Sequence, residues 1–401
     1  MSAAGRNCHA VVLSGGGANG AFEVGVMKAL FDGRSPVSPG APLEVGVFTG
    51  TSVGSFNAAF MVSQPDVSSA ETAENLKHLW LTRVAENPAR CGNGVFRFRG
   101  NTLDFLDGDC LLLHPFKPIE QLAGDTQFLA RDWLRRMGHF LRAPGSLEQR
   151  ALELFDLSAF VSTEPLRTLL EETVSLEGIG RSDKKLRIAA TDFVSGDLRV
   201  FRRSDLSGAI GHLPILASAA IPGFFPPVEI NGGTYVDGGL VMNTPLLPAI
   251  EAGADVIHMI YLDPDVKNIP LARLHNTYDT MDRMMTTQFA IKVNEDVATV
   301  RWINDGLEVV ERAAKGRKTA DSISNKDLRS FFQAAGQIAR RLRDGTPYRK
   351  VTIHRYHPPE DLGGPLGLLD FNKGRIEELI ARGDQDAVQH DCADSGCVLP
   401  T

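Results

Sequence analysis

The hydrophobic pattern at the start of the chain alternates between short apolar runs and helical stretches. An apolar run with β-branched residues over 10–14 ends in consecutive glycines, and apolar residues then recur at helical spacing over 21–31. The same order returns with an apolar run over 43–48, a glycine-containing turn and an Ala-rich stretch over 55–62. Two successive strand–turn–helix units predict an α/β fold in which helices flank a mostly parallel sheet.

The pattern changes after this region, where helical segments mix with irregular Gly- and Pro-containing ones. We interpret residues 65–183 as a largely helical insertion or cap within one domain spanning 8–387, whose core is about 8–64 and 184–387. The short polar segment 388–401 is expected to be a disordered tail. The second part of the core is predicted to hold strands at 185–191, 198–201, 227–230, 234–236, 256–262 and 351–356, and helices at about 271–314 and 372–387.

Composition narrows the class of protein. The chain has 401 residues, of which 43% are hydrophobic and 23% charged, and its net charge is −7. These fractions are ordinary for a folded globular protein and exclude a disordered or collagen-like chain. The negative net charge provides no basic field to attract DNA or RNA, so we expect no nucleic-acid partner.

Targeting signals and metal motifs are not apparent. The N-terminal segment lacks the apolar stretch of a signal peptide, and no apolar run approaches the roughly 20 residues that span a bilayer. No two cysteines form a C-x-x-C pair, so their spacing indicates neither a zinc site nor a disulfide framework, and this favours a reducing compartment. The five are Cys8, Cys91, Cys110, Cys392 and Cys397. We expect a cytoplasmic protein, at most peripheral on membranes, with no metal or cofactor; its oligomeric state stays open.

The first candidate site is the pentapeptide Gly50-Thr-Ser52-Val-Gly54. In a G-x-S-x-G turn between a strand and a helix, the serine takes strained backbone angles that project its hydroxyl from the sheet. The flanking glycines are needed because side chains there would collide with neighbouring elements, and the helix N-terminus adds positive potential. The apolar run before the motif and the Ala-rich stretch after it favour Ser52 as a nucleophile.

The second candidate site is the glycine-rich turn Gly15-Gly16-Gly17-Ala-Asn-Gly20. Consecutive glycines before a helix expose several backbone N–H groups in one direction, which suits either a phosphate or the oxyanion of an acyl intermediate. No Gly-Lys-Ser/Thr follows, which excludes a P-loop. The glycines also fit the G-x-G-x-x-G of dinucleotide sites, but no acidic residue ends the second strand, where the ribose would bind. We therefore disfavour a nicotinamide cofactor.

The third candidate site is Asp237-Gly238-Gly239, which follows a predicted hairpin. A carboxylate at a strand end can approach a serine hydroxyl and act as its general base. Asp-Gly is also a common turn, so this motif indicates a general base only in combination with the other two motifs.

In this order, the three motifs resemble those of the patatin-like phospholipase family. Two further segments are similar to that family: residues 217–226, ASAAIPGFFP, and residues 370–376, DFNKGRI. The resemblance covers roughly residues 8–62 and 184–387. It implies a three-layer α/β/α patatin-like fold with a Ser–Asp dyad in place of a catalytic triad.

The resemblance also implies a role for each motif. Ser52 is then the nucleophile and Asp237 the general base, and the oxyanion hole is formed by the amides of Gly15, Gly16 and Gly17. The glycines that support the motifs are Gly20, Gly50, Gly54, Gly238 and Gly239. The implied protein is a serine lipid acyl hydrolase (phospholipase A, lysophospholipase or esterase) that forms an acyl-enzyme with phospholipid or another acyl ester. The family usually has Arg or Lys where this chain has Asn19, which bears on loop anchoring and head-group choice.

Three alternatives stay open at this point. The same dyad can pass its acyl group to an alcohol or thiol, as an acyltransferase does, and Asn19 is compatible with a non-catalytic lipid- or partner-binding module. An α/β-hydrolase triad needs a histidine after the acid, and four are available in chain order: His258, His275, His354 and His357. We favour the dyad because His258 lies in an apolar strand, which is typical of a core imidazole, and the last two flank a strand without a loop signature.

Two weaker sequence features concern contact with lipid. Residues 131–142 form a basic amphipathic stretch of the kind that lies on membranes, although such a stripe more often packs on the protein's own core. Its apolar positions are 133, 134, 137, 140 and 141. A second stripe, formed by Met281, Met284, Met285 and Phe289, has the composition of an acyl-chain pocket, with core packing as the more common alternative.

Overall fold

The computed structural model describes most of the chain. The described residues are 8–40, 42–87, 91–100, 108–142, 157–263, 277–315, 349–363 and 367–400, with isolated positions between 326 and 341.

A single mixed sheet forms the centre of the molecule, with strand order β10-β9-β1-β2-β5-β8-β7 and β6 on the second edge of β5. The strands from β10 to β5 are parallel, whereas β6, β7 and β8 are antiparallel to their neighbours. Their bounds are β1 His9–Leu13, β2 Val47–Thr51, β5 Lys185–Asp192, β6 Leu198–Arg202, β7 Val228–Ile230, β8 Gly233–Asp237, β9 Val256–Ile260 and β10 Thr352–Tyr356. This confirms the predicted strands; β2 begins later than expected, at Val47.

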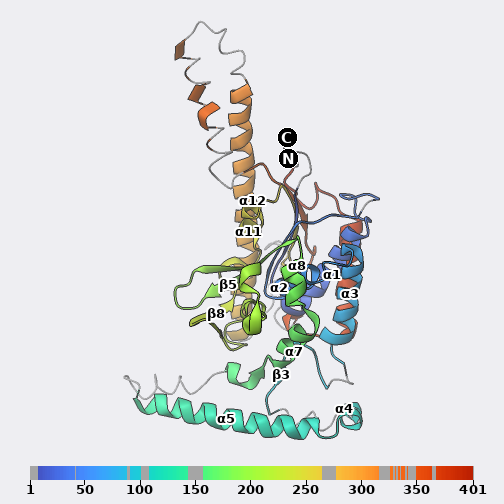
Figure 1. Ribbon diagram of the computed structural model, residues 1–401, viewed down its shortest axis with the longest axis vertical. Coiled ribbons are helices and arrows are strands. Elements are labelled where there is room, and N and C mark those ends of the chain that lie inside the picture. Colours follow the sequence, from blue (N-terminus) through green and yellow to red (C-terminus); the bar gives the residue numbers. More distant parts are fainter. Residues whose placement is uncertain are drawn as a thin grey trace.

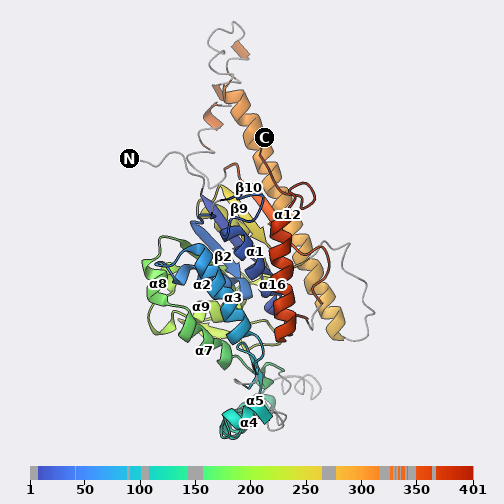
Figure 2. The same ribbon diagram turned by 90° about the vertical axis from the view of Figure 1, so that its right-hand side faces the viewer.

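Helices cover both faces of the sheet, which confirms the predicted three-layer α/β/α architecture (Figure 2). One apolar core lies under α1, α2, α3 and α16, and a second lies under α11 and α12. Figure 1 shows that α12 continues well past the sheet. The helices used below are α1 Gly20–Phe31, α2 Val53–Ser63, α3 Ser69–Leu79, α4 Gly108–Leu113, α5 Lys117–Arg142, α7 Glu164–Thr173, α9 Leu213–Ser218, α10 Gly239–Met242, α11 Leu246–Glu251, α12 Thr277–Lys315 and α16 Lys373–Val388.

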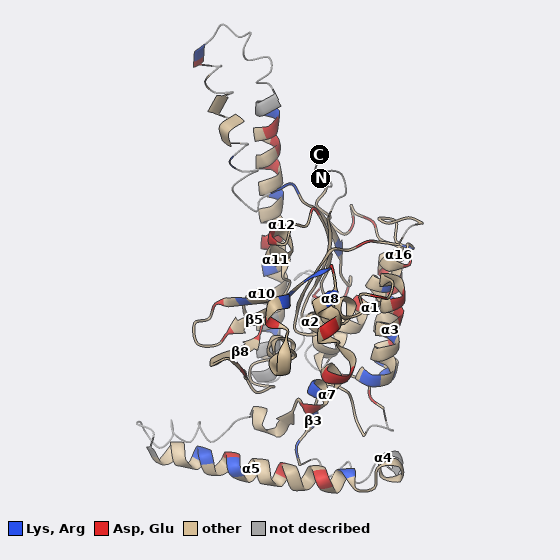
Figure 3. Ribbon diagram, in the orientation of Figure 1, with Lys and Arg blue, Asp and Glu red and all other residues tan. Residues whose placement is uncertain are grey.

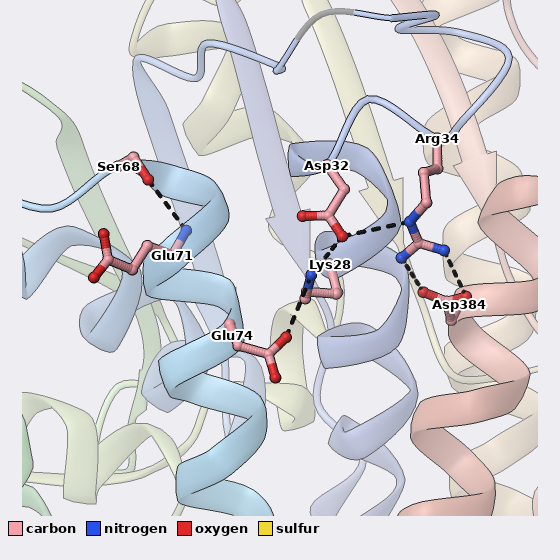
Figure 4. Close-up of polar contacts among 7 residues, drawn as sticks. All are labelled: Lys28, Asp32, Arg34, Ser68, Glu71, Glu74 and Asp384. Atoms are coloured by element: carbon pink, nitrogen blue, oxygen red, sulfur yellow. Dashed lines mark hydrogen bonds and ion pairs between the residues drawn. The ribbon is translucent and has the colours of Figure 1, made fainter.

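Helices α1 and α16 pack closely although they are far apart in the sequence. A Cβ on Gly25 would lie 2.0 Å from the main-chain oxygen of Ile380, so only glycine allows this approach. Ion pairs close the end of the layer: Lys28 Nζ lies 3.3 Å from Glu74 of α3, and Arg34 Nη1 donates to Asp384 of α16 at 2.9 Å (Figure 4). The C-terminal helix therefore completes the core that the N-terminal strand–turn–helix unit begins.

The segment predicted as an insertion does not stand apart over its whole length. Leu76 and Trp80 near its start, and Leu166 and Leu170 of α7, are buried in the same core as α1 and α2. Only the middle of the segment leaves the core. A short pair of strands, β3 Arg97–Phe98 and β4 Val161–Ser162, leads from this core, in which Val161 still lies, to α4 and α5.

Helix α5 crosses one end of the molecule, away from the sheet (Figure 1). Its charged residues Asp125 and Asp132 are buried, whereas Trp133 and Leu134 are 56% and 64% exposed. Arg97 holds the helix by donating to both carboxylate oxygens of Asp125 at 2.7 Å. The exposed apolar residues of α4, α5 and their link include Leu112, Leu113, Phe116, Ile119, Trp133, Leu134 and Leu141. The apolar stripe predicted over 131–142 thus points largely to the outside of the described protein.

Two expectations about the cysteines and the tail were wrong. Cys91 and Cys110 form a disulfide, because folding brings together two residues whose spacing carried no signal; this removes the argument for a reducing compartment. The segment after α16 is ordered through residue 400, where Val398 pairs with Ile353 of β10 through two main-chain hydrogen bonds of 2.8 and 2.9 Å. Strand β10 is at the edge of the sheet, where its main-chain N–H and C=O groups have no further strand to pair with. The segment after α16 therefore pairs with this edge.

Among the described helices, none combines the length and the apolar character needed to cross a bilayer.

Candidate active site

Ser52 lies at a sharp turn between β2 and α2. Its backbone has φ 54° and ψ −125°, a positive φ that residues with a Cβ rarely adopt, as the G-x-S-x-G motif predicted. A Cβ on Gly50 would lie 2.2 Å from the main-chain oxygen of Gly54. A Cβ on Gly54 would itself lie 2.6 Å from the main-chain oxygens of Leu13 and Ser14. The two glycines thus allow the turn to close against β1 and hold Ser52 at the N-terminus of α2.

The pairing of β5 explains how Asp237 reaches Ser52. One edge of β5 is occupied by β6, so β2 and β8 both pair with the other edge. Thr51 at the end of β2 lies opposite Ala189, and Asp237 at the end of β8 lies opposite the next residue, Ala190. Because β2 is parallel to β5 and β8 is antiparallel to it, their ends meet at one point. The structure therefore brings together the two predicted dyad residues, since Ser52 follows Thr51.

The Asp237 carboxylate is buried beside the serine hydroxyl. Burial raises the pKa of Asp237 from 3.8 to about 6, although the nearby Ser52 side chain and the Gly239 N–H both favour the ionised carboxylate. The Gly239 bond is 2.7 Å long, and the Thr191 hydroxyl donates to the main-chain oxygen of Asp237 at 2.9 Å. A fixed carboxylate whose pKa is raised toward neutrality has the properties required of a general base.

The glycine loop packs against the serine, but one of its amides is engaged elsewhere. A Cβ on Gly15 would lie 3.1 Å from the Cβ of Ser52, so the loop and the hydroxyl are neighbours. The Gly15 N–H donates to the main-chain oxygen of Asn243 at 3.1 Å, which corrects the assignment of this amide to an oxyanion hole. Within the described residues, the N–H groups of Gly16 and Gly17 have no acceptor, and Gly17 lines the same pocket as Ser52.

The remaining motif glycines lie at close contacts around Ser52 and Asp237. Gly20 begins α1, and a Cβ there would lie 2.5 Å from the Val53 side chain, directly after the serine. A Cβ on Gly238 would lie 2.4 Å from the main-chain oxygen of Ala189. Gly239 begins α10 and donates to Asp237.

A guanidinium from α16 lies against residue 19. The Nη2 of Arg375 donates to the Oδ1 of Asn19 at 2.9 Å and also bonds the main-chain oxygen of Leu362. Asn19 is 6% exposed. The resemblance places Arg or Lys in the family where this chain has Asn19, and here a cation lies beside Asn19 on a residue 356 positions away in the chain.

Two residues that sequence analysis did not single out hold the site together. The hydroxyl of Ser218 accepts from the Ser52 N–H at 2.8 Å and donates to the main-chain oxygen of Ala189 at 2.6 Å. Asn243 accepts from the Gly15 N–H through its main chain and donates to the Gly15 oxygen at 3.3 Å through its side chain. Only Ser218 had a signal, because it lies in the segment 217–226 that resembles the family.

The patatin-like phospholipase family model matches residues 11–250, more than half of the chain. The chain belongs to the patatin-like phospholipase family. The family is described by its phospholipase members.

Individual relatives match more weakly. Uncharacterized NTE family proteins of Mycobacterium tuberculosis and Mycobacterium bovis are 29% identical over 133 residues, which cover 32% of this chain and 36% of theirs. The chain therefore spans about a third of the length of these curated relatives. The crystal structure of VipD from Legionella pneumophila shares 12% identity at a TM-score of 0.34, over 95% of this chain and 67% of that one.

In this patatin-like chain, Ser52 and Gly17 line one pocket whose other walls are apolar. Helices α2, α7 and α9 and the segment before α16 form these walls. The side chains are Val53, Phe56, Trp80, Val84, Val95, Leu166, Leu169, Ile215, Ala219, Ile221, Phe225, Leu368, Leu369 and Phe371. Two segments far apart in the sequence, around 80–95 and 368–371, therefore enclose the space beside the serine.

Of the second predicted stripe, Met284 and Phe289 are not among the residues that line this pocket. Met284 is 62% exposed, the side chains of Met281 and Met285 lie outside the described residues, and Phe289 lies near Gly239, 3.5 Å from the position of a Cβ there.

The structure does not favour the histidine triad. Burial, the Ser52 side chain and the Gly239 N–H are the influences on the Asp237 pKa, with no histidine among them. His258 is 1% exposed within β9, with the rings of His9 and His354 stacked at centroid distances of 5.5 and 5.3 Å. The His357 ring stacks on Tyr261 at 4.8 Å, and His275 lies outside the described residues.

Proposed function

We propose that this chain is a serine lipid acyl hydrolase that uses Ser52 and Asp237 as a catalytic dyad. The observation that carries the proposal is the closeness of the Ser52 side chain to a buried Asp237 carboxylate, near enough to favour its ionised form, at the wall of an otherwise apolar pocket. Such a pocket is complementary to a hydrocarbon chain and has little to offer a polar substrate. The substrate class is therefore a carboxylic ester with a long acyl chain, as in phospholipids and lysophospholipids.

The reaction follows from the positions of the side chains. Asp237 takes the proton of the Ser52 hydroxyl while Oγ attacks the ester carbonyl, and the carbonyl electron pair moves onto oxygen. The amides of Gly16 and Gly17 donate to this oxyanion, each worth on the order of 3 kcal/mol in other acyl-transfer enzymes. The electron pair on the oxyanion then re-forms the carbonyl double bond. The C–O bond to the alcohol breaks, and Asp237 gives its proton to the leaving oxygen.

The second half repeats these steps with water. Asp237 accepts a proton from a water molecule that attacks the acyl-enzyme, and Ser52 leaves with that proton as the free acid is released. The histidine that a triad would use is replaced by direct contact between acid and nucleophile.

We further propose that α4 and α5 rest on the lipid surface. Their exposed apolar side chains point away from the described protein, and bringing them into lipid removes apolar area from water. Basic residues are interspersed along α5 (Figure 3). Asp132 pairs with Arg135 and Arg136 within the helix at 2.6 Å each, so Arg131 adds positive charge suited to anionic lipid.

The test is product analysis by mass spectrometry on a mixed lipid extract, with wild type and Ser52→Ala compared side by side. We expect free fatty acid and the corresponding lysolipid or alcohol from wild type alone. Labelling of wild type by a fluorophosphonate probe, lost in Ser52→Ala, shows that the serine is activated. Acyl transfer to an added alcohol at the expense of free acid would instead assign an acyltransferase. A folded wild type with neither labelling nor products would leave a non-catalytic lipid-binding module.

A further inference from the structure

The segment after α16 gathers two cysteines and two histidines at one point. His354 lies on β10, whereas His390, Cys392 and Cys397 follow α16. One nitrogen or sulfur from each side chain takes part, and these four atoms all lie within 4.8 Å of one another. His390 is buried and the other three are half-buried. The four side chains form the one group of this kind within the described residues.

The spacing of these atoms is that of ligands around one metal ion. The Sγ of Cys392 lies 3.4 Å from the Nδ1 of His354 and 3.5 Å from the Nε2 of His390, and the Sγ of Cys397 lies 3.4 Å from the same Nε2. Zinc–sulfur bonds of about 2.3 Å and zinc–nitrogen bonds of about 2.0–2.1 Å in a tetrahedron place sulfur and nitrogen about 3.5 Å apart. All three distances agree with this value.

Outer contacts also fit a bound metal. The N–H of Arg355 lies 3.4 Å from the Sγ of Cys397, where it can donate to a thiolate. The second ring nitrogen of His390, Nδ1, lies 3.4 Å from the hydroxyl of Ser395. Metal-binding histidines usually engage their other ring nitrogen in this way, which fixes the orientation of the ring.

We propose that these four side chains bind one Zn²⁺ ion in a tetrahedral Cys₂His₂ site. Thiolate and imidazole ligands select zinc over the oxygen-seeking Mg²⁺ and Ca²⁺, and each thiol releases its proton when the metal binds. Four protein ligands leave no position for substrate, so the ion is structural. It fastens the segment after α16 to β10, and with it the C-terminal end of the helix whose first turn places Arg375 against Asn19.

The experiment measures metal content on the full chain, purified without immobilised metal and under reducing conditions. We expect one zinc per chain in wild type by inductively coupled plasma mass spectrometry, and loss of that equivalent in the double variant Cys392→Ser/Cys397→Ser. The matched control is Cys8→Ser, which removes a half-buried free cysteine elsewhere and should retain one zinc. Replacement by Co²⁺ should give the visible absorption of tetrahedral cobalt and a thiolate charge-transfer band in wild type and Cys8→Ser.

If the double variant fails to fold, the proposal can still be tested on wild type alone. Chelation should expose two additional thiols to a thiol reagent, and added zinc should protect them again. A wild type without metal that binds neither added Zn²⁺ nor Co²⁺ would overturn the proposal. A Cys392–Cys397 disulfide in freshly purified protein would also overturn it, and so would unchanged metal content in a folded double variant. None of these readouts depends on ester hydrolysis, so they stand apart from the proposed function.

Discussion

Helices α16 and α5 are both amphipathic, yet they bury opposite faces. Helix α16 buries Ile376 and Leu379 in the core under the sheet, and its first turn carries Arg375 to the glycine loop. Helix α5 buries Asp125 and exposes Trp133. A helical period fixes which residues share a face, but what covers that face is decided by the rest of the fold. We therefore expect changes around the buried dyad to affect every substrate, and changes on α5 to affect only lipid in membranes.

The largest effect is expected at the dyad itself. Ser52→Ala should lower the rate of ester hydrolysis by roughly 10³-fold or more on both micellar and water-soluble esters, because the nucleophile is removed. The measurement is kcat/KM on a short-chain chromogenic ester and on phospholipid vesicles. The exposed Ser207→Ala is the matched control and should behave as wild type. Hydrolysis by Ser52→Ala at more than a small fraction of the wild-type rate contradicts the assignment.

Asp237→Asn should abolish activity and yet stabilise the fold. Burial raises the folded-state pKa of Asp237 from 3.8 to about 6, so ionisation costs stability as the pH rises through this range and the full cost is present above it. At about 1.4 kcal/mol per pKa unit, relief amounts to at most about 3 kcal/mol near pH 8.

Urea unfolding of wild type and Asp237→Asn at several pH values checks this linkage. The difference in the free energy of unfolding should shrink toward pH 4, where the Asp237 carboxyl is neutral in the folded state. A variant that is less stable than wild type at pH 8 would show that the Gly239 hydrogen bond and the nearby Ser52 side chain outweigh the cost of burial.

The pH dependence of the rate should report the same group. Asp237 must be ionised to accept the serine proton, so kcat/KM on an uncharged ester should fall about tenfold per pH unit below a midpoint near 6. An acid limb centred near pH 4 would show that the carboxylate is better solvated than its burial implies. A midpoint near 7 that disappears in a histidine variant would return the triad to consideration.

The smallest effect on activity is expected from substitutions on α5. It tests the contrast between this exposed helix and the buried dyad. Trp133→Ser/Leu134→Ser should weaken binding to anionic phospholipid vesicles and lower hydrolysis of vesicle lipid by about tenfold, since about 1.4 kcal/mol of apolar burial is tenfold in affinity. Hydrolysis of a water-soluble ester should be unchanged. Trp302→Ser removes a more exposed tryptophan, 81% accessible on α12, and is the matched control. Equal vesicle binding by all three proteins would show that α5 does not contact lipid.

Local features of this protein could be read from the sequence. The strand–turn–helix units, the strained turn at Ser52 and the helix that begins after Asn372 depend on neighbouring residues: glycine where no Cβ fits, apolar residues at a fixed period, a cap that accepts an N–H. These determinants act within a few positions, so they are visible in the linear pattern. Asp237 was identifiable only because it accompanied the other two motifs.

Other features required the tertiary structure. That Asp237 meets Ser52 depends on β2 and β8 sharing one edge of β5, and that Gly15 is engaged by Asn243 depends on a loop 228 positions away. The disulfide of Cys91 and the cluster that His354 forms with Cys392, 38 positions later, have no short spacing to reveal them. The outward face of α5 is likewise a property of what the fold leaves uncovered. Local geometry is encoded in neighbouring residues, whereas contacts between distant segments arise only when strand register and helix packing place them together.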